Sequence, residues 1–129
     1  MINSSLEGIK IKTLWTNPEL DGTSNLSYFN AQTIEINGIS DYDIIGICHS
    51  SYAREFSRFN FILNIPNKNQ NIDITFSDET AEYHFGGYNR VLTILENGIS
   101  FKDGYMSLVR GRDKNNAYAI PIKIIGIKL

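Results

Sequence analysis

Short stretches in which apolar and polar residues alternate recur along the whole chain, and they constrain its fold more than any other feature. Such stretches are "GIKIKTLW" (8–15), "QTIEINGI" (32–39), "RFNFILNI" (58–65) and "NIDITFS" (71–77). Successive side chains of a β-strand point to opposite faces of a sheet, so a period of two residues predicts strands with one buried, apolar face. The run "YDIIGICHSSY" (42–52) is denser in isoleucine and predicts a central strand buried on both faces.

The second half of the chain continues the alternation and adds a strong turn signal. "RVLTILENGISF" (90–101) holds two apolar runs joined by Asn97-Gly98, a pair that accepts positive φ and is typical of a tight β-hairpin. "AIPIKIIGIKL" (119–129) is a last isoleucine-rich run. Other turn-forming residues separate the runs: Asp21-Gly22, residues 67–71, Gly86-Gly87, Asp103-Gly104 and residues 111–116.

Turns at intervals of roughly 8–14 residues are typical of antiparallel sandwiches and barrels. No stretch of a dozen residues keeps a helical period, and we expect a turn of helix only within Ser51–Phe59. The sequence therefore predicts an all-β protein, a jelly-roll-like antiparallel β-sandwich of about eight or nine strands. With 129 residues and no linker, residues 1–129 are expected to form a single domain.

Charge and cysteine content exclude several classes of protein. The chain has 14 acidic and 12 basic residues, and no Lys/Arg cluster that would neutralise a row of phosphates, so we expect no nucleic-acid partner. Its single cysteine rules out an internal disulfide, so folding in a reducing cytoplasm is expected. No window resembles a signal peptide or a membrane span, which predicts neither secretion by that route nor membrane insertion.

Four residues are predicted to have structural roles. Trp15, just before the Asn17-Pro18 turn, is expected in the core at one end of the sandwich. Pro121 cannot donate a main-chain hydrogen bond, so we place its strand at a sheet edge, or Pro121 at the first residue of the strand or at a bulge. If Arg90 points inward it needs a partner, for which the carboxylate of Asp43 is a candidate.

Candidate catalytic and metal-binding residues are few. Cys48 and His49 resemble a nucleophile and a base, but adjacent strand residues point to opposite faces, so Cys48 cannot use His49. A metal site formed by His49, His84 and Asp41 or Asp43 lacks the ligand spacing typical of zinc. Carboxylates that could serve glycoside hydrolysis are not brought together by the sequence: Glu35, Asp73, Asp78, Glu79 and Glu82. We predict no catalytic residue, no metal and no cofactor.

Several aromatic residues fall in or beside predicted loops, where they could stack on sugar rings or anchor a protein interface. The alternative interpretation is that they close the ends of the sandwich. The candidate surface or glycan contacts are Tyr28, Phe29, Tyr83, Phe85, Tyr88 and Tyr105.

Short segments of a longer sequence motif are distributed along the whole chain. "LWTNP" (14–18) leads through a loop to "NAQTIEI" (30–36) and "SDYD" (40–43), and Asn89-Arg90, Asp103-Gly104-Tyr105 and "IPIKIIGIKL" (120–129) follow. Together they resemble small structural proteins encoded by tailed phages of Gram-positive hosts. Those proteins have the same LWTNP start, a phenylalanine-alanine-alanine-glutamine-threonine strand and an isoleucine-proline-leucine-lysine-isoleucine-tyrosine-glycine-isoleucine ending. This chain departs from that pattern in its longer loop "ELDGTSNLSY" (19–28) and in Asn30, so the resemblance carries over no loop-borne specificity.

The resemblance implies a non-enzymatic virion protein, docked on the virion surface as a tail- or fibre-associated or host-attachment component. Such a protein would fold in the host cytoplasm, assemble into the particle and leave by lysis. The partners expected are other virion proteins, further copies of the chain within the particle and a host surface glycan. Two alternatives stay open: a capsid decoration protein that stabilises the shell, and a carbohydrate-binding module or glycan-acting enzyme domain.

Overall fold

The predicted strands are present in a computed structural model of the chain, which describes residues 8–20, 28–52, 57–77, 85–108 and 111–129. The strands within these residues are β1 (Lys10–Thr16), β2 (Gln32–Glu35), β3 (Ile44–Ser50), β4 (Ser57–Leu63), β5 (Asn69–Ser77), β6 (Phe85–Leu95), β7 (Gly98–Leu108), β8 (Gly111–Lys114) and β9 (Pro121–Lys128). Two single turns of 3-10 helix, η1 (Pro18–Leu20) and η2 (Ile39–Asp41), are the helical elements of this part of the chain. Neither turn has the length or the apolar character needed to cross a membrane.

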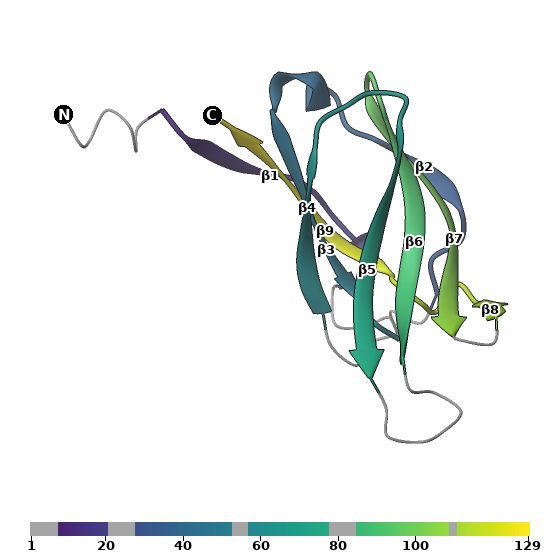
Figure 1. The fold of residues 1–129 in the computed structure, drawn as a ribbon. Helices are drawn as coiled ribbons and strands as arrows, with labels where there is room; N and C mark the ends of the chain where they lie inside the picture. The colour runs from purple at the N-terminus through teal and green to yellow at the C-terminus, as the bar shows by residue number, and fades with distance from the viewer. Residues whose placement is uncertain (1–7, 21–27, 53–56, 78–84, 109–110) are drawn as a thin grey trace.

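The strands form two antiparallel sheets that pack face to face (Figure 1). Sheet A has the order β1-β9-β3-β4, and sheet B has the order β2-β7-β6-β5 with β8 paired to β7. The chain crosses between the sheets after β1, β2, β4 and β8, and makes hairpins or short connections within a sheet elsewhere. The predicted antiparallel β-sandwich is confirmed.

Inward-facing residues of both sheets make one core, in which isoleucine predominates. Two edge-to-face contacts link aromatic rings in it: Phe29 lies 5.6 Å from Phe101 and 6.2 Å from Trp15, centroid to centroid. The core residues are Phe29, Ile34, Ile36, Ile39, Ile45, Ile47, Ile72, Leu92, Ile94, Ile99, Phe101, Ile120 and Ile124. Trp15 is half-buried and packs against this core, as predicted.

The position of Pro121 differs in part from the prediction. Pro121 is the first residue of β9, which is one of the alternatives, but β9 is not an edge strand because it lies between β1 and β3. The β3–β9 register shifts between Cys48 and His49, opposite Pro121, so the ladder is already irregular where the proline has no N–H to donate. The strand predicted within residues 42–52 is central, since β3 lies between β9 and β4, but it is not buried on both faces, because Ile44 and Cys48 on its outer side are only partly buried.

Residues 57–63 form a strand whose apolar side faces away from the core, the reverse of the expected orientation. Phe59, Phe61 and Leu63 of β4 are exposed, whereas Asn60 and Ile62 point between the sheets. The polar Asn60 is tolerated there because its Oδ1 accepts hydrogen bonds from the main-chain N–H of Asp73 (2.7 Å) and from the ring of His49 (2.6 Å).

Of the turns predicted from glycine pairs, one is present and two lie inside strands. The hairpin at Asn97-Gly98 is confirmed, but Gly98 is already the first residue of β7, where a Cβ would collide with the carbonyl oxygen of Ile34 on β2. Gly86-Gly87 and Asp103-Gly104 are not turns, because they lie inside β6 and β7. The helical turn expected within Ser51–Phe59 is wrong for residues 57–59, which belong to β4, and residues 53–56 are outside the described part.

Candidate functional site

The outer surfaces of the two sheets differ sharply in chemistry. Outward-facing positions of sheet B carry mostly hydroxyl, amide and carboxylate groups, with the apolar side chains of Val91 and Leu95 among them. The polar positions are Thr33, Glu35, Asn71, Asp73, Thr75, Asn89, Thr93, Ser100 and Ser107. Outward-facing positions of sheet A are mostly apolar. We call that surface the apolar face; its residues are Ile11, Thr13, Ile44, Gly46, Cys48, Phe59, Phe61, Leu63, Lys123, Ile125 and Ile127.

Strand register places these residues side by side across sheet A. Leu63 pairs with Ile44, Ile44 with Ile127 and Ile127 with Ile11, which makes an apolar row across all four strands. The exposed fractions are 61% for Leu63 and 66% for Ile11. The edge strands thus expose large apolar side chains that a water-facing sheet would replace with polar ones.

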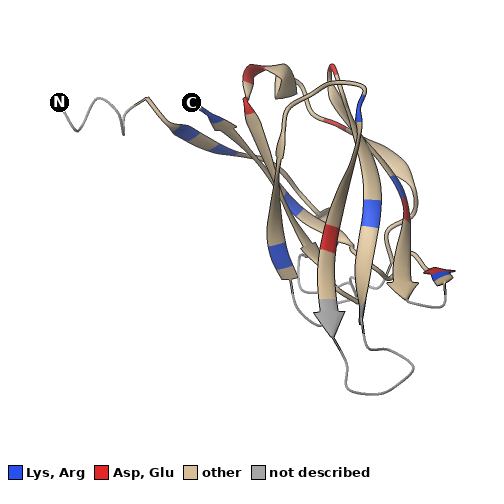
Figure 2. Cartoon of the chain, viewed as in Figure 1, with Lys and Arg blue, Asp and Glu red and all other residues tan. Residues whose placement is uncertain are grey.

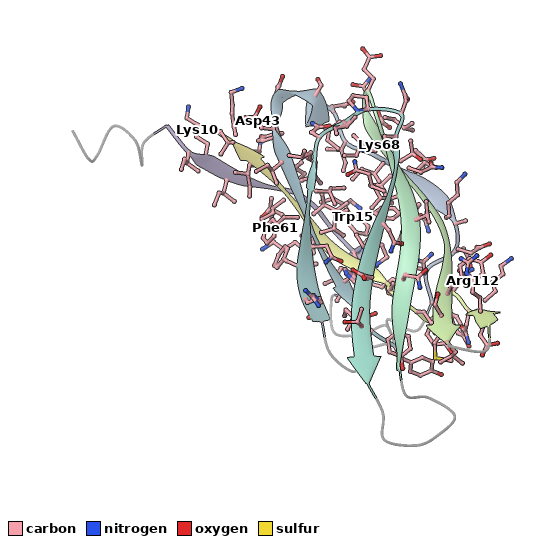
Figure 3. All side chains as sticks on the ribbon, in the orientation of Figure 1. Lys10, Trp15, Asp43, Phe61, Lys68 and Arg112 are labelled. Carbon is pink, nitrogen blue, oxygen red and sulfur yellow. The ribbon has the colours of Figure 1, made fainter. Side chains whose placement is uncertain are left out.

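Gly46 lies near the centre of the apolar face and keeps it flat. Phe61 and Ile125 lean over it from the two neighbouring strands, so that a Cβ at Gly46 would come within 2.9 Å of the Phe61 ring and 2.8 Å of Ile125. The Phe61 ring also stacks on Phe59, with centroids 5.7 Å apart and planes 14° apart. Figure 3 shows Phe61 on the outer side of sheet A, away from the space between the sheets.

The apolar face has one charged residue among its described positions, Lys123 of β9. The other charges of sheet A lie at its ends, as Figure 2 shows: Arg58 near the start of β4, and Lys10, Lys12 and Lys128 where β1 and β9 extend beyond the body of the sandwich. A surface with so few charges in a chain in which 20% of residues are charged is suited to burial against another apolar surface.

Arg90 makes more hydrogen bonds than any other buried side chain described. The predicted pairing of Arg90 with the carboxylate of Asp43 is wrong. The guanidinium donates to main-chain carbonyls only: Nε to Ala119 (2.9 Å), Nη1 to Lys102 (2.7 Å) and Nη2 to Tyr118 (2.9 Å) and Asn116 (3.4 Å). It also lies 5.3 Å from the ring centroid of Phe29. Asp43 instead accepts a hydrogen bond from the main-chain N–H of Leu129. Burial lowers the pKa of Arg90 to about 10, against the opposing attraction of Asp103, so the group stays charged at neutral pH.

Cys48 and His49 lie on opposite faces of β3, as predicted. Cys48 belongs to the apolar face and is half-buried opposite Phe59, whereas His49 is buried between the sheets. The Asn60 oxygen already accepts from the Asp73 N–H, so it must accept from His49 Nε2 as well, which assigns the Nε2–H tautomer. Burial lowers the pKa of His49. Its contacts with the Asn60 amide oxygen and the Ser50 carbonyl oppose that shift, because the ring can donate to both oxygens only when both of its nitrogens are protonated.

The candidate aromatic contacts do not form one surface. Tyr28 is exposed, as expected for a contact residue, but the expectation for Phe29 is wrong because its ring is buried in the core. Tyr88 is half-buried, 5.1 Å from Tyr118, and Tyr105 is half-buried beneath the guanidinium of Arg112 at 3.8 Å. Tyr83 and the side chain of Phe85 lie outside the described part.

Tyr28 lines a hollow of about 230 Å³ at one end of the sandwich. The other residues that line it include Trp15, Phe29, Glu19 and Gln32. An exposed ring beside amide and carboxylate groups is the chemistry that carbohydrate contacts use.

The remaining polar candidates are dispersed. Glu35 on β2 and Asp73 on β5 lie at opposite edges of sheet B, about 14 Å or more apart at the usual strand spacing, which is too far to flank one glycosidic bond. In the described part of the chain no group of three or more His, Cys, Asp or Glu side chains is placed to hold a metal ion. Asp78, Glu79, Glu82 and His84 are outside that part.

The fold brings together two of the segments on which the resemblance to phage proteins was based. Asn17 of "LWTNP" donates its side-chain N–H to the carbonyl of Pro121 (3.0 Å) and its main-chain N–H to the carbonyl of Ile122 (2.8 Å), both in "IPIKIIGIKL".

Sequence reasoning missed the apolar face, although its signal was present in "RFNFILNI", where an apolar stripe was taken to be core. Searches against models of known protein families and against curated proteins find no match to this chain.

Proposed function

We propose that the protein is a non-enzymatic structural component of a phage virion, a tail-associated or host-attachment module held in the particle by its apolar face. The observation that carries this proposal is that face, a four-stranded surface with exposed Phe, Leu and Ile side chains and one charge. Large exposed apolar patches on otherwise polar proteins mark sites of protein–protein contact. The outer surface of sheet B is mostly polar, which suits a module that is anchored on one side.

The resemblance to phage structural proteins supports the proposal that the particle is a phage virion. Its two most distinctive segments, "LWTNP" and "IPIKIIGIKL", form the neighbouring strands β1 and β9 of sheet A. These strands supply Ile11, Ile125 and Ile127 to the apolar face. Of these three residues, Ile125 and Ile127 belong to a segment that carries the resemblance, whereas Ile11 precedes the other segment on β1.

Mass spectrometry of purified particles of the phage that encodes the chain tests the proposal. We expect peptides of this protein in the particle at a fixed ratio to the major structural proteins. Its absence from particles, with its presence in the lysate that produced them, would reject the proposal. Location of its density on the head rather than the tail would instead favour a capsid decoration protein.

Glycan contact is a second candidate role, favoured by the hollow at Trp15 and Tyr28. A glycan array probed with the wild-type protein and with Tyr28→Ala tests it, since Tyr28 is exposed and its loss leaves the core intact. Binding that Tyr28→Ala abolishes is the expected result for this role. An array without hits, or binding unchanged in the variant, would remove it.

A further inference from the structure

We propose that the partner across the apolar face is a second copy of this chain, so that two sandwiches stack through their A sheets around a twofold axis. This inference rests on the proposed function, which assigns assembly to that face, and it adds the identity of the partner. Three properties of the face support it: its area, its flatness and the position of its single charge.

The area of the apolar face matches that of one side of a stable dimer interface. Strands β1, β3 and β4 are seven residues long and β9 is eight. At usual strand dimensions such a sheet covers roughly 19 Å by 23 Å. This footprint is about 440 Å² before the relief of Phe61, Leu63 and Ile11 is counted, and those side chains add accessible area toward the about 800 Å² per partner of a standard interface. A peptide or small ligand would leave most of such a surface in water.

The flatness of the face favours another sheet as the occupant. Because Phe61 and Ile125 fill the space above Gly46, the centre of the face has no groove for a peptide or a helix ridge. Sheets stack face to face about 10 Å apart with apolar side chains interdigitated, as sheets A and B do within this molecule. A twofold interface requires one surface that is complementary to itself, and a uniformly apolar sheet meets that requirement.

The position of the charged residue on the face allows the two copies of it in a dimer to stay apart. Lys123 lies at the end of the face next to Cys48 and Phe59, two residues along β9 from Ile125. A twofold axis that lies between the stacked sheets, runs across the strands and passes near Gly46 puts the two Lys123 side chains on opposite sides of it, roughly 14 Å apart along the strands and so more than a Debye length of about 10 Å. Both ammonium groups can then reach water at the rim, as lysine does at interfaces.

The test is the oligomeric state of the full chain in solution, measured by light scattering after gel filtration over a range of concentrations. We expect a particle of twice the monomer mass of 14.6 kDa that dissociates on dilution. Phe61→Glu and Leu63→Glu should each weaken the dimer at least tenfold, because each buries a carboxylate in an apolar interface. Thr33→Glu, on the exposed edge strand β2 of sheet B, is the matched control and should leave the dimer unchanged.

The native thiol of Cys48 gives a second measurement. In the dimer Cys48 is covered, so its reaction with a maleimide should be slow at high protein concentration and speed up on dilution. In Leu63→Glu the reaction should be fast at every concentration. Leu63 pairs with Ile44, at the other end of β3 from Cys48, so this effect reports dissociation and not local repacking. Circular dichroism and thermal melting confirm that the variants remain folded.

A chain that is monomeric at all concentrations, with a rapidly reacting Cys48, would overturn the inference and leave the face to a different virion protein. A dimer that survives both substitutions would overturn it as well. The outcome is separable from the proposed function: a monomer found in particles rejects only the dimer, and a dimer absent from particles rejects only the virion role.

Discussion

Arg90 is a buried cation held by main-chain carbonyls. Its donors meet the oxygens of Lys102, Tyr118 and Ala119, and of Asn116 at longer range, so the side chain ties β7 to the segment that leads into β9. Ala119 in that segment has a φ of 49°, in the left-handed region that non-glycine residues rarely adopt. The guanidinium thus holds a strained loop in place, and the strain is offset by hydrogen bonds to a charged donor.

Replacing Arg90 with methionine, which has a similar length and no donors, should lower the free energy of unfolding by about 3 kcal/mol or more. The loss arises because the buried carbonyls of Ala119 and Tyr118 lose their hydrogen bonds to the guanidinium. Urea denaturation measures it. Arg112→Met is the control: Arg112 is exposed and stacks on Tyr105, so its replacement should cost about 1 kcal/mol at most. Equal stabilities of the two variants would contradict this account of Arg90.

His49 should make the protein less stable in mild acid. Burial lowers its pKa in the folded state below the ordinary value of 6.5, whereas the unfolded chain keeps that value. Between the two values the unfolded state binds more protons, so the free energy of unfolding falls as the pH drops through and below 6.5. His49→Gln, although less stable overall, should lose less stability between pH 7 and pH 5 than the wild type does. Parallel pH profiles from chemical denaturation would show that His49 does not cause the effect.

At the scale of single elements, β7 shows why a glycine sits inside a strand. Gly104 lies where β7 passes the loop held by Arg90, and a Cβ there would collide with the carbonyl of Tyr118 and come within 2.8 Å of Arg90 Nη2. The glycine therefore makes room for the guanidinium and its carbonyl ligands, and does not form the turn that Asp103-Gly104 suggests in the sequence.

Gly104→Ala should destabilise the protein by at least about 2 kcal/mol, because main chain and a buried side chain must both move. Gly87→Ala is the matched control. It lies inside β6 of the same sheet, where a Cβ would meet its nearest neighbour at an ordinary 3.5 Å. That substitution should change stability by less than about 1 kcal/mol. Thermal melting of both variants measures the difference, and similar melting temperatures would show that the space around Gly104 is not limiting.

At the scale of the whole molecule, the outer surfaces of the two sheets differ in chemistry. Sheet B presents mostly polar groups on its outer surface, sheet A presents the apolar face, and both contribute isoleucines to the shared core. The long-range pairing of the first and last strands, Lys10 with Lys128 and Ile11 with Ile127, closes the sandwich.

Deleting residues 121–129 should abolish folding, because β9 pairs with both β1 and β3, and its removal leaves β1 without a partner and β3 paired with β4 alone. Circular dichroism and thermal melting of the truncated chain check this. A soluble truncation that melts cooperatively would show that sheet A does not depend on β9. The control, deletion of Leu129 alone, removes an exposed residue outside the strand and should melt as the full chain does.

The sequence by itself determined the strands, the sandwich and the 97–98 hairpin, because alternation and turn chemistry are local properties of neighbouring residues. It could not decide which side of a strand meets the other sheet. In β4 the stripe of Phe59, Phe61 and Leu63 points outward, since His49 and Asp73 hold Asn60 on the inside. The burial of Phe29 and the carbonyl partners of Arg90 likewise depend on segments far away in the chain. Only tertiary structure decided these features, and the apolar face with them, because each depends on how residues distant in sequence pack together.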